Sequence, residues 1–180
     1  TGLTAQNVFG TIAGRSDEVV MLTAHMDSFF YGANDNASGL AVMLALARHY
    51  SRPDAPKPRR TLVFVGTSGH HAHDDKGGYS AGVTDLIAKH GELLKRTAFV
   101  YNAEHIGARH SEVQRDILTS QPLIVTSNQE NPFLVSVSNR SPKVIQLLNE
   151  SMGRYGIPAL AQTNHFPFGD PSPFFFAGVP

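Results

Sequence analysis

Residues 19–50 read VVMLTAHMDSFFYGANDNASGLAVMLALARHY, and their pattern indicates the class of fold. It begins with a short apolar run, residues 19–24, which ends at polar residues as a buried strand does. It finishes with residues 38–50, which are rich in Ala and Leu and predict a mostly buried helix. The candidates for the N-cap of that helix are Asp35, Asn36 and Ser38. A buried strand that leads into a buried helix indicates a layered α/β protein.

The rest of the chain continues this alternation. We expect further strands at residues 8–12 (an edge strand), 61–65, 98–101, within 117–126, and at 174–176. We expect further helices at residues 81–90 and 141–155, the second with Pro142 in its first turn and Gly156 at its end. Because no internal repeat is visible, we expect residues 1–180 to form a single α/β domain with a largely parallel sheet.

The composition excludes several classes of function. The 180 residues include 15 basic and 15 acidic side chains, so no basic face for nucleic acid is indicated. No apolar run reaches the roughly 20 residues of a membrane-spanning helix, and no signal-peptide pattern opens the chain. The chain has no cysteine, so secreted and cytoplasmic locations both stay open. The nine histidines, several of them clustered, are the unusual feature.

Polar side chains directly follow three of the expected strands. They are His25 after the second strand, His70 and His71 after the third, and Glu104 after the fourth. In α/β sheets, ligands gather at the carboxyl ends of the strands. We therefore expect these side chains to lie together at one edge of the sheet.

Two short motifs precede the helix at residues 38–50. In His25-Met26-Asp27, one ring nitrogen of the imidazole can bind a metal while the carboxylate holds the other ring N–H. The alternative for this motif alone is an Asp–His pair that closes a turn. In the second motif, GANDNASG at residues 32–39, Asp35 lies in a tight turn, where an N-cap is the alternative function.

Together and in this order, the two motifs and the helix resemble the zinc-dependent exopeptidases related to aminopeptidases S and Y. Glutaminyl cyclases, glutamate carboxypeptidase and the transferrin receptor ectodomain belong to the same superfamily. The resemblance covers about residues 7–180 and is strongest over 7–50 and 61–69. It implies a three-layer fold with a central, mostly parallel mixed sheet between helices. It also implies two zinc ions about 3.5–4 Å apart, bridged by a carboxylate and a water.

The resemblance assigns metal-site roles to individual residues. His25 resembles a histidine ligand, Asp27 the partner behind it, and Asp35 the bridging carboxylate, which implies a cis peptide between Asp35 and Asn36. Glu104, in the segment NAEHIG at residues 102–107, stands where the family has its next acid, and His165 where it has its last histidine. One ion would then lie on His25, Asp35 and Glu104, and the other on Asp35, His71 and His165.

The chain departs from the family at His70-His71, where the family has two adjacent glutamates, the first a general base and the second a ligand. His71 can still bind zinc, because imidazole is an ordinary zinc ligand. His70 can act as the base, because an imidazole with a pKa of about 6.5 accepts protons near neutral pH. The loss of two negative charges should weaken at least one metal site or lower the pKa of a bound water, so a site with one ion is an alternative to a site with two. For the pair the alternative is a solvated loop, for Glu104 it is a surface acid at the end of a strand, and for His165 it is a loop histidine.

The resemblance implies a metal-dependent hydrolase of the aminopeptidase type, which cleaves an amide bond near a peptide terminus with a metal-activated water. Its substrate would be a peptide or a small amide, and neither the preferred side chain nor the oligomeric state is indicated. The alternatives are a non-catalytic binding or scaffold homologue and a one-metal transferase similar to glutaminyl cyclase. The family usually has more chain before Asn7 and beyond Gly178-Val179-Pro180, so the resemblance implies either a fragment or a trimmed sheet.

Overall fold

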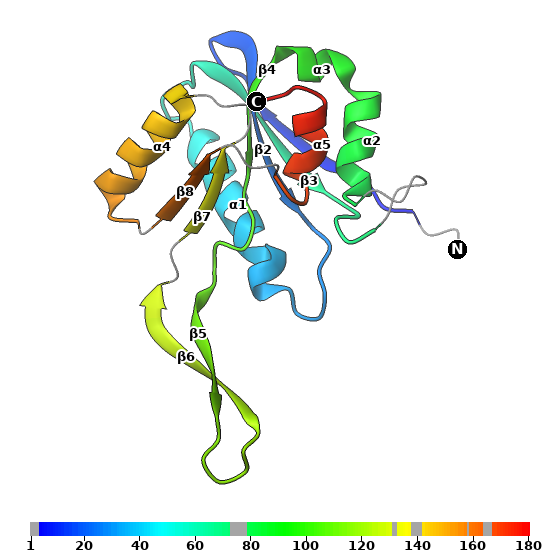
Figure 1. The fold of residues 1–180 in the computed structure, drawn as a ribbon. Helices are drawn as coiled ribbons and strands as arrows, with labels where there is room; N and C mark the ends of the chain where they lie inside the picture. Colours follow the sequence, from blue (N-terminus) through cyan, green and yellow to red (C-terminus); the bar gives the residue numbers. More distant parts are fainter. Residues whose placement is uncertain (1–3, 73–78, 131–132, 138–141, 158, 164–166) are drawn as a thin grey trace.

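The structure is a computed structural model that describes residues 4–72, 79–130, 133–137, 142–157, 159–163 and 167–180 (Figure 1). Its elements are, in chain order, β1 (Val8–Ile12), β2 (Ser16–His25), η1 (Ala33–Ala37), α1 (Ser38–Tyr50), β3 (Arg60–Thr67), α2 (Ala81–Lys89), α3 (Gly91–Arg96), β4 (Thr97–Asn102), β5 (Arg109–Arg115), β6 (Pro122–Glu130), β7 (Phe133–Val137), α4 (Pro142–Tyr155), β8 (Ala159–Thr163) and α5 (Pro171–Phe176). The apolar run at residues 19–24 therefore lies inside β2, and the Ala- and Leu-rich segment forms α1, as expected.

The central sheet has four strands in the order β1-β3-β2-β4. Strand β2 pairs in parallel with both β3 and β4, whereas β1 pairs antiparallel with β3 at the edge of the sheet. The sheet is therefore mixed and mostly parallel, which confirms the expected fold class. Because β2, β3 and β4 run in the same direction, their carboxyl ends lie at one edge (Figure 1).

Helices cover both faces of this sheet. Val19 and Met21 of β2 face one side, where they pack with residues of α2 and α5 such as Leu86 and Phe174. Leu22 and Ala24 of the same strand face the other side, where they pack with α1. Side chains alternate between the two faces of a strand, so a fully apolar strand such as β2 needs a helix on each side. The expected three layers are present.

The expectation of a strand at residues 174–176 is wrong, because these residues belong to helix α5. A short apolar run does not by itself distinguish a buried strand from a buried helix. Pro171 lies in the first turn of α5, a position that proline favours. The helix buries Phe174 against the sheet, whereas Phe176 remains exposed.

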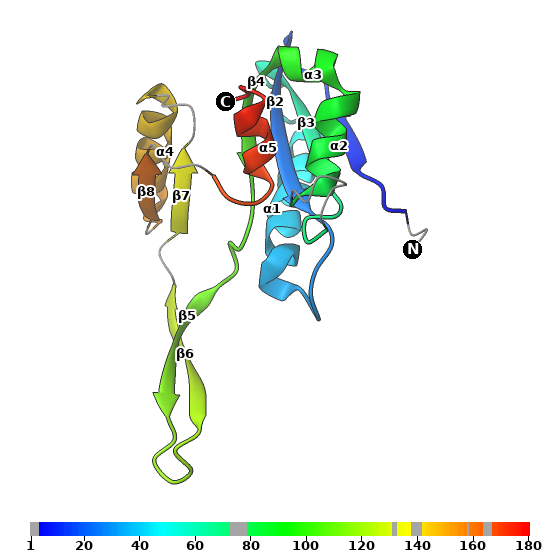
Figure 2. The ribbon, with the colours of Figure 1, turned by 45° about the vertical axis from the view of Figure 1, so that its right-hand side comes forward.

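Two groups of elements stand apart from the central sheet. The β5–β6 hairpin projects from the body, and α4 lies with the parallel pair β7 and β8 to one side of the sheet (Figures 1 and 2). Strands β5, β7 and β8 and helix α3 were not expected from the sequence. Within the described ranges, every helix is too short or too polar to span a membrane.

Candidate metal centre

The side chains expected at the strand ends do converge at one edge of the sheet. His25 is the last residue of β2, His70 and His71 lie a few residues beyond β3, and Glu104 lies two residues beyond β4. His165 lies outside the described residues, so its expected role as a ligand stays a prediction.

His25 is fully buried, and its ring is held from one side. Its Nδ1 lies 2.8 Å from the backbone carbonyl oxygen of Asp27. Because a carbonyl only accepts, Nδ1 must carry the hydrogen, and Nε2 of a neutral ring keeps a free lone pair. The spacing of the His-x-Asp motif led us to expect the Asp27 carboxylate in this place, but it is 3.9 Å from Nδ1.

The Asp27 carboxylate instead positions the segment after β3. Its two oxygens accept hydrogen bonds of 3.1 Å from the backbone amides of His70 and His71. Burial acts to raise the pKa of Asp27, but these amide hydrogen bonds outweigh it and hold the pKa below its ordinary value. An ionised Asp27 therefore fixes the backbone that carries both histidines.

Asp35 reaches the site from η1, on a backbone that is pinned to the end of β4. The Asn36 side chain donates to the Ala103 carbonyl at 2.9 Å and accepts from the Gly39 amide at 3.1 Å, so it satisfies an amide in the first turn of α1, whose N-cap residue is Ala37. Gly39 is required here, because a Cβ would lie 2.2 Å from the Ala103 carbonyl oxygen. The Asp35–Asn36 peptide is cis, as the resemblance implied.

Glu104 is oriented by its own hydrogen-bond chain. Thr23 of β2 donates to Asn102 at 2.8 Å, and Asn102 donates to Glu104 Oε2 at 2.9 Å. The other oxygen, Oε1, lies 3.8 Å from His25 Nε2 and 3.6 Å from His70 Nε2. One oxygen of Glu104 is thus anchored while the other faces two imidazole nitrogens.

His70 is held by Asp170, a residue that the sequence analysis did not single out. Asp170 is buried and accepts from His70 Nδ1 at 2.8 Å and from the Thr67 hydroxyl at 2.6 Å. The hydrogen bond with Asp170 raises the pKa of His70, against the opposing effect of burial. Burial acts to raise the pKa of Asp170 itself, but the hydrogen bonds from His70 and Thr67 keep it below its ordinary value. The sequence offers one feature that could have identified Asp170: it is an isolated acid within an apolar stretch rich in Pro and Phe, residues 166–176.

Two further imidazoles face Asp35. His71 Nε2 lies 3.8 Å from Asp35 Oδ2, and the His71 ring is 4.2 Å from the ring of Phe29. His105 Nε2 lies 3.3 Å from Asp35 Oδ1, although the sequence analysis gave His105 no role. Five of the six expected residues in the described part, all except Asp27, therefore surround one small volume together with His105.

The donor atoms at the centre fit a metal ion. His25 Nε2 and Asp35 Oδ1 are 2.9 Å apart, yet both are buried and neither has a hydrogen-bond partner, and His71 Nε2 is unpartnered in the same way. Two acceptor atoms that face each other in a buried site need either a proton or a metal cation between them. Three sets of side chains each bring their donor atoms within 4.8 Å of one another: His25, His70 and Glu104; His25, Asp35 and His71; and Asp35, Glu104 and His105.

A comparison with known families agrees with this geometry. The sequence profile described as Peptidase family M28 matches residues 7–180. The chain belongs to peptidase family M28. The suspected relationship with zinc exopeptidases is thereby confirmed.

This M28 chain is similar to proteins of several kinds. Transferrin receptor protein 1 of Gallus gallus is 31% identical over 142 residues, which are 73% of this chain and 17% of that protein. BSAP, a zinc aminopeptidase from Bacillus subtilis, superposes with a TM-score of 0.70 at 22% identity, over 99% of this chain and 39% of that chain. A glutaminyl cyclase from an Acidobacteriales bacterium superposes with a TM-score of 0.67 at 20% identity, over 97% and 56%. These structural matches establish the fold alone, and the M28 chain spans 17% of the length of the receptor.

Proposed function

We propose that this M28 domain is a metal-dependent hydrolase of the aminopeptidase type, which cleaves an amide bond near a peptide terminus. The observation that carries the proposal is the pair of buried acceptor atoms, His25 Nε2 and Asp35 Oδ1, which lie 2.9 Å apart without a hydrogen bond. A buried arrangement of this kind costs free energy unless a cation occupies it. Family membership supports zinc as that cation.

In this proposal, His25, Asp35, Glu104 and His71 are metal ligands, with Asp35 shared if two ions bind. His165 is the further ligand that the resemblance implies. Imidazole and carboxylate are both ordinary zinc ligands at about 2.0–2.2 Å. Zinc bound there would polarise the scissile carbonyl and lower the pKa of a water.

His70 is the general base in this proposal, in place of the family's glutamate. Its Nδ1–H points at the Asp170 carboxylate, which leaves the Nε2 lone pair directed toward Glu104 and the rest of the centre. The ring stacks on His25 with 4.0 Å between centroids and an interplanar angle of 11°. The stacked ring of His70 therefore lies directly beside the ring of His25, where its Nε2 would accept a proton next to the ion that His25 holds. His70 would take a proton from water and pass it to the leaving amine.

The contact between Phe29 and His71 supports a substrate with an apolar terminal residue. The segment that joins β2 to η1 carries Phe29, Phe30 and Tyr31, all exposed, and Phe29 packs against His71. Aromatic side chains beside a polar centre bind apolar groups through buried area. Among aminoacyl-nitroanilides, we expect leucine and phenylalanine derivatives to react faster than lysine or glutamate derivatives.

The test is elemental analysis of the purified protein together with turnover on a panel of aminoacyl-nitroanilides. The proposal predicts one or two zinc ions per chain and activity that a chelator removes and zinc restores. Bound metal without any hydrolysis would contradict the peptidase activity, and the absence of bound metal would contradict the whole proposal.

A second candidate function is a non-catalytic binding domain of the same fold, because the similarity to transferrin receptor protein 1 extends over 73% of this chain. The missing glutamate pair favours the same candidate. Retention of a histidine or a carboxylate at His25, Asp35, His71 and Glu104 favours the enzyme, since these are all residues that bind zinc. A one-metal transferase similar to glutaminyl cyclase is distinguished by release of ammonia from an N-terminal glutamine substrate.

A further inference from the structure

We infer that His105 is a metal ligand, and that one ion of the centre is held by Asp35, Glu104 and His105. This inference rests on the metal requirement of the proposed function but not on the reaction. The resemblance supplies no role for His105, and it relies on His165 to complete one of its two ligand sets. The described residues provide a three-donor set that does not need His165.

The distances around His105 suit coordination. Its Nε2 lies 3.3 Å from Asp35 Oδ1 and 3.8 Å from Glu104 Oε1. In a tetrahedral zinc site with bonds of about 2.0–2.2 Å, neighbouring donor atoms are roughly 3.3–3.6 Å apart. Asp35 Oδ1 has two imidazole nitrogens within 3.3 Å, those of His25 and His105, and still has no hydrogen-bond partner. An ion bound between these three atoms would explain why they lie so close together although Asp35 Oδ1 forms no hydrogen bond.

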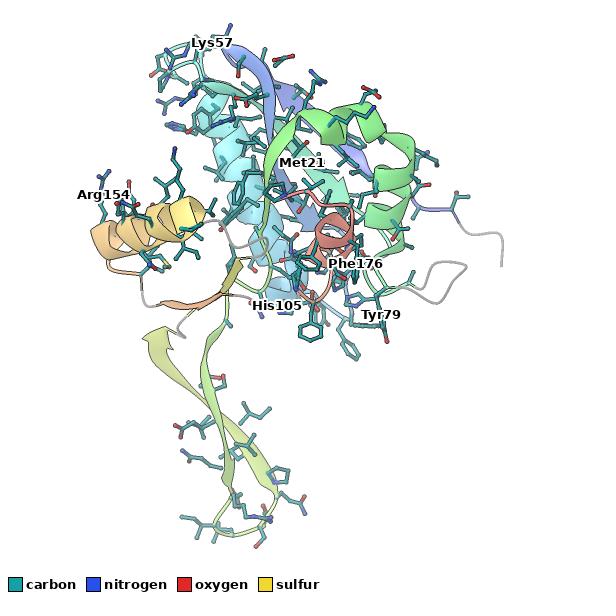
Figure 3. All side chains as sticks on the ribbon, turned by 45° about the horizontal axis from the view of Figure 1, so that its top comes forward. Met21, Lys57, Tyr79, His105, Arg154 and Phe176 are labelled. Atoms are coloured by element: carbon teal, nitrogen blue, oxygen red, sulfur yellow. The ribbon has the colours of Figure 1, made fainter. Side chains whose placement is uncertain are left out.

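The backbone at residues 105–107 is fixed in the position that brings His105 to the acids. His105 has φ of +54°, in the left-handed region that few side chains adopt readily. The next two amides are tied to the segment that carries Asp35: Ile106 N donates to the Ser38 hydroxyl and Gly107 N to the Asn34 side chain, both at 3.1 Å. The Asp35 loop and the His105 loop are thus held as one unit. Figure 3 shows His105 at the end of the body from which the β5–β6 hairpin departs.

The set formed by Asp35, Glu104 and His105 has the composition of a catalytic site. Catalytic zinc ions usually have three protein ligands and an open position, whereas structural zinc sites are closed by four. The His105 side chain is 52% exposed, so this ion would lie on the solvent side of the centre. The buried ring of His25 would lie on its inner side.

The experiment compares zinc binding to the whole chain and to two variants, by titration calorimetry and by elemental analysis after dialysis. His105→Asn removes the imidazole but keeps a residue that tolerates positive φ, so the loop should fold as in the parent. His49→Ala removes another exposed histidine, on α1 beside Tyr50, and is the matched control. Cobalt substitution adds a readout of the ligand set, because the visible spectrum of Co²⁺ depends on the number and kind of its ligands.

For His105→Asn we expect at least a tenfold weaker affinity for one zinc ion and a changed cobalt spectrum, with the unfolding midpoint of the metal-free protein unchanged. His49→Ala should bind as the parent does. Parent-like affinity and cobalt spectrum in His105→Asn would overturn the inference, as would a parent that binds no zinc. Because no substrate is used, absence of hydrolysis would contradict the proposed reaction and leave the ligand assignment standing.

Discussion

His70 and His71 are adjacent in the sequence, yet their side chains have different neighbours. His70 Nδ1 contacts the Asp170 carboxylate, whereas His71 Nε2 faces Asp35 and has no hydrogen-bond partner. Their backbones, by contrast, are held in the same way, because the Asp27 carboxylate accepts a hydrogen bond from the backbone amide of each. The two residues should therefore fail differently when they are replaced.

His71→Ala should lose bound metal, because a ligand disappears and the donors left behind cannot complete its ion. His70→Ala should keep its metal and lose turnover by roughly 10²–10⁴-fold, the usual contribution of a positioned acid–base group. Metal content and kcat of both variants provide the test. If both bind metal and react as the parent does, the pair has no part in the centre.

Asp170→Asn should lower kcat by roughly 10²–10⁴-fold without loss of metal. A neutral amide oxygen accepts a hydrogen bond from His70 Nδ1 more weakly than a carboxylate does. In the other orientation of the amide, its N–H donates to Nδ1, so the ring hydrogen of His70 moves to Nε2. The ¹⁵N NMR shifts of the His70 ring report this tautomer directly. Asp116→Asn is the control, because Asp116 is an exposed acid that caps the turn of the β5–β6 hairpin. An unchanged tautomer together with unchanged kcat would show that Asp170 does not position the base.

At the scale of elements, the contact between the start of α1 and the end of β4 aligns Asp35 with Glu104. Asn36 and Gly39 of the first segment both lie against the Ala103 carbonyl of the second. The geometry of the centre therefore depends on how closely the two backbones approach.

Gly39→Ala should destabilise the fold by about 1–3 kcal/mol, as overpacking does, because its Cβ would lie 2.2 Å from the Ala103 oxygen. The same substitution in α4, Gly153→Ala, meets nothing within 4 Å and should stabilise its helix by about 0.5–1 kcal/mol. Urea unfolding of the metal-free proteins measures both changes. Equal effects at the two positions would mean that the approach of α1 to β4 is not tight.

At the scale of the whole molecule, stability resides in the central sheet and its helices, and not in the projecting hairpin. Leu86 of α2 is fully buried against the sheet, whereas Ile117, in the turn of the β5–β6 hairpin, is 95% exposed. Truncation of an exposed apolar side chain removes almost no buried apolar area, so it should change the free energy of unfolding little.

Leu86→Ala should lower the free energy of unfolding by about 2–5 kcal/mol, because it removes buried apolar area and leaves a cavity. Ile117→Ala should change it by less than about 0.5 kcal/mol. Denaturant unfolding followed by circular dichroism gives both values. A large loss for Ile117→Ala would indicate that the hairpin packs against the body or against another chain in solution.

From the sequence alone we could predict the α/β class, the limits of α1 and the placement of candidate metal ligands after β2, β3 and β4. These features follow from local rules: apolar periodicity defines strands and helices, and parallel strands bring their carboxyl ends to one edge. Only the tertiary structure decided that residues 174–176 are helical, that Asp170 holds His70 across 100 residues, and that His105 faces Asp35. Such pairings depend on how distant segments pack against one another. They could not be predicted from the sequence, because the spacing of residues along the chain does not specify that packing.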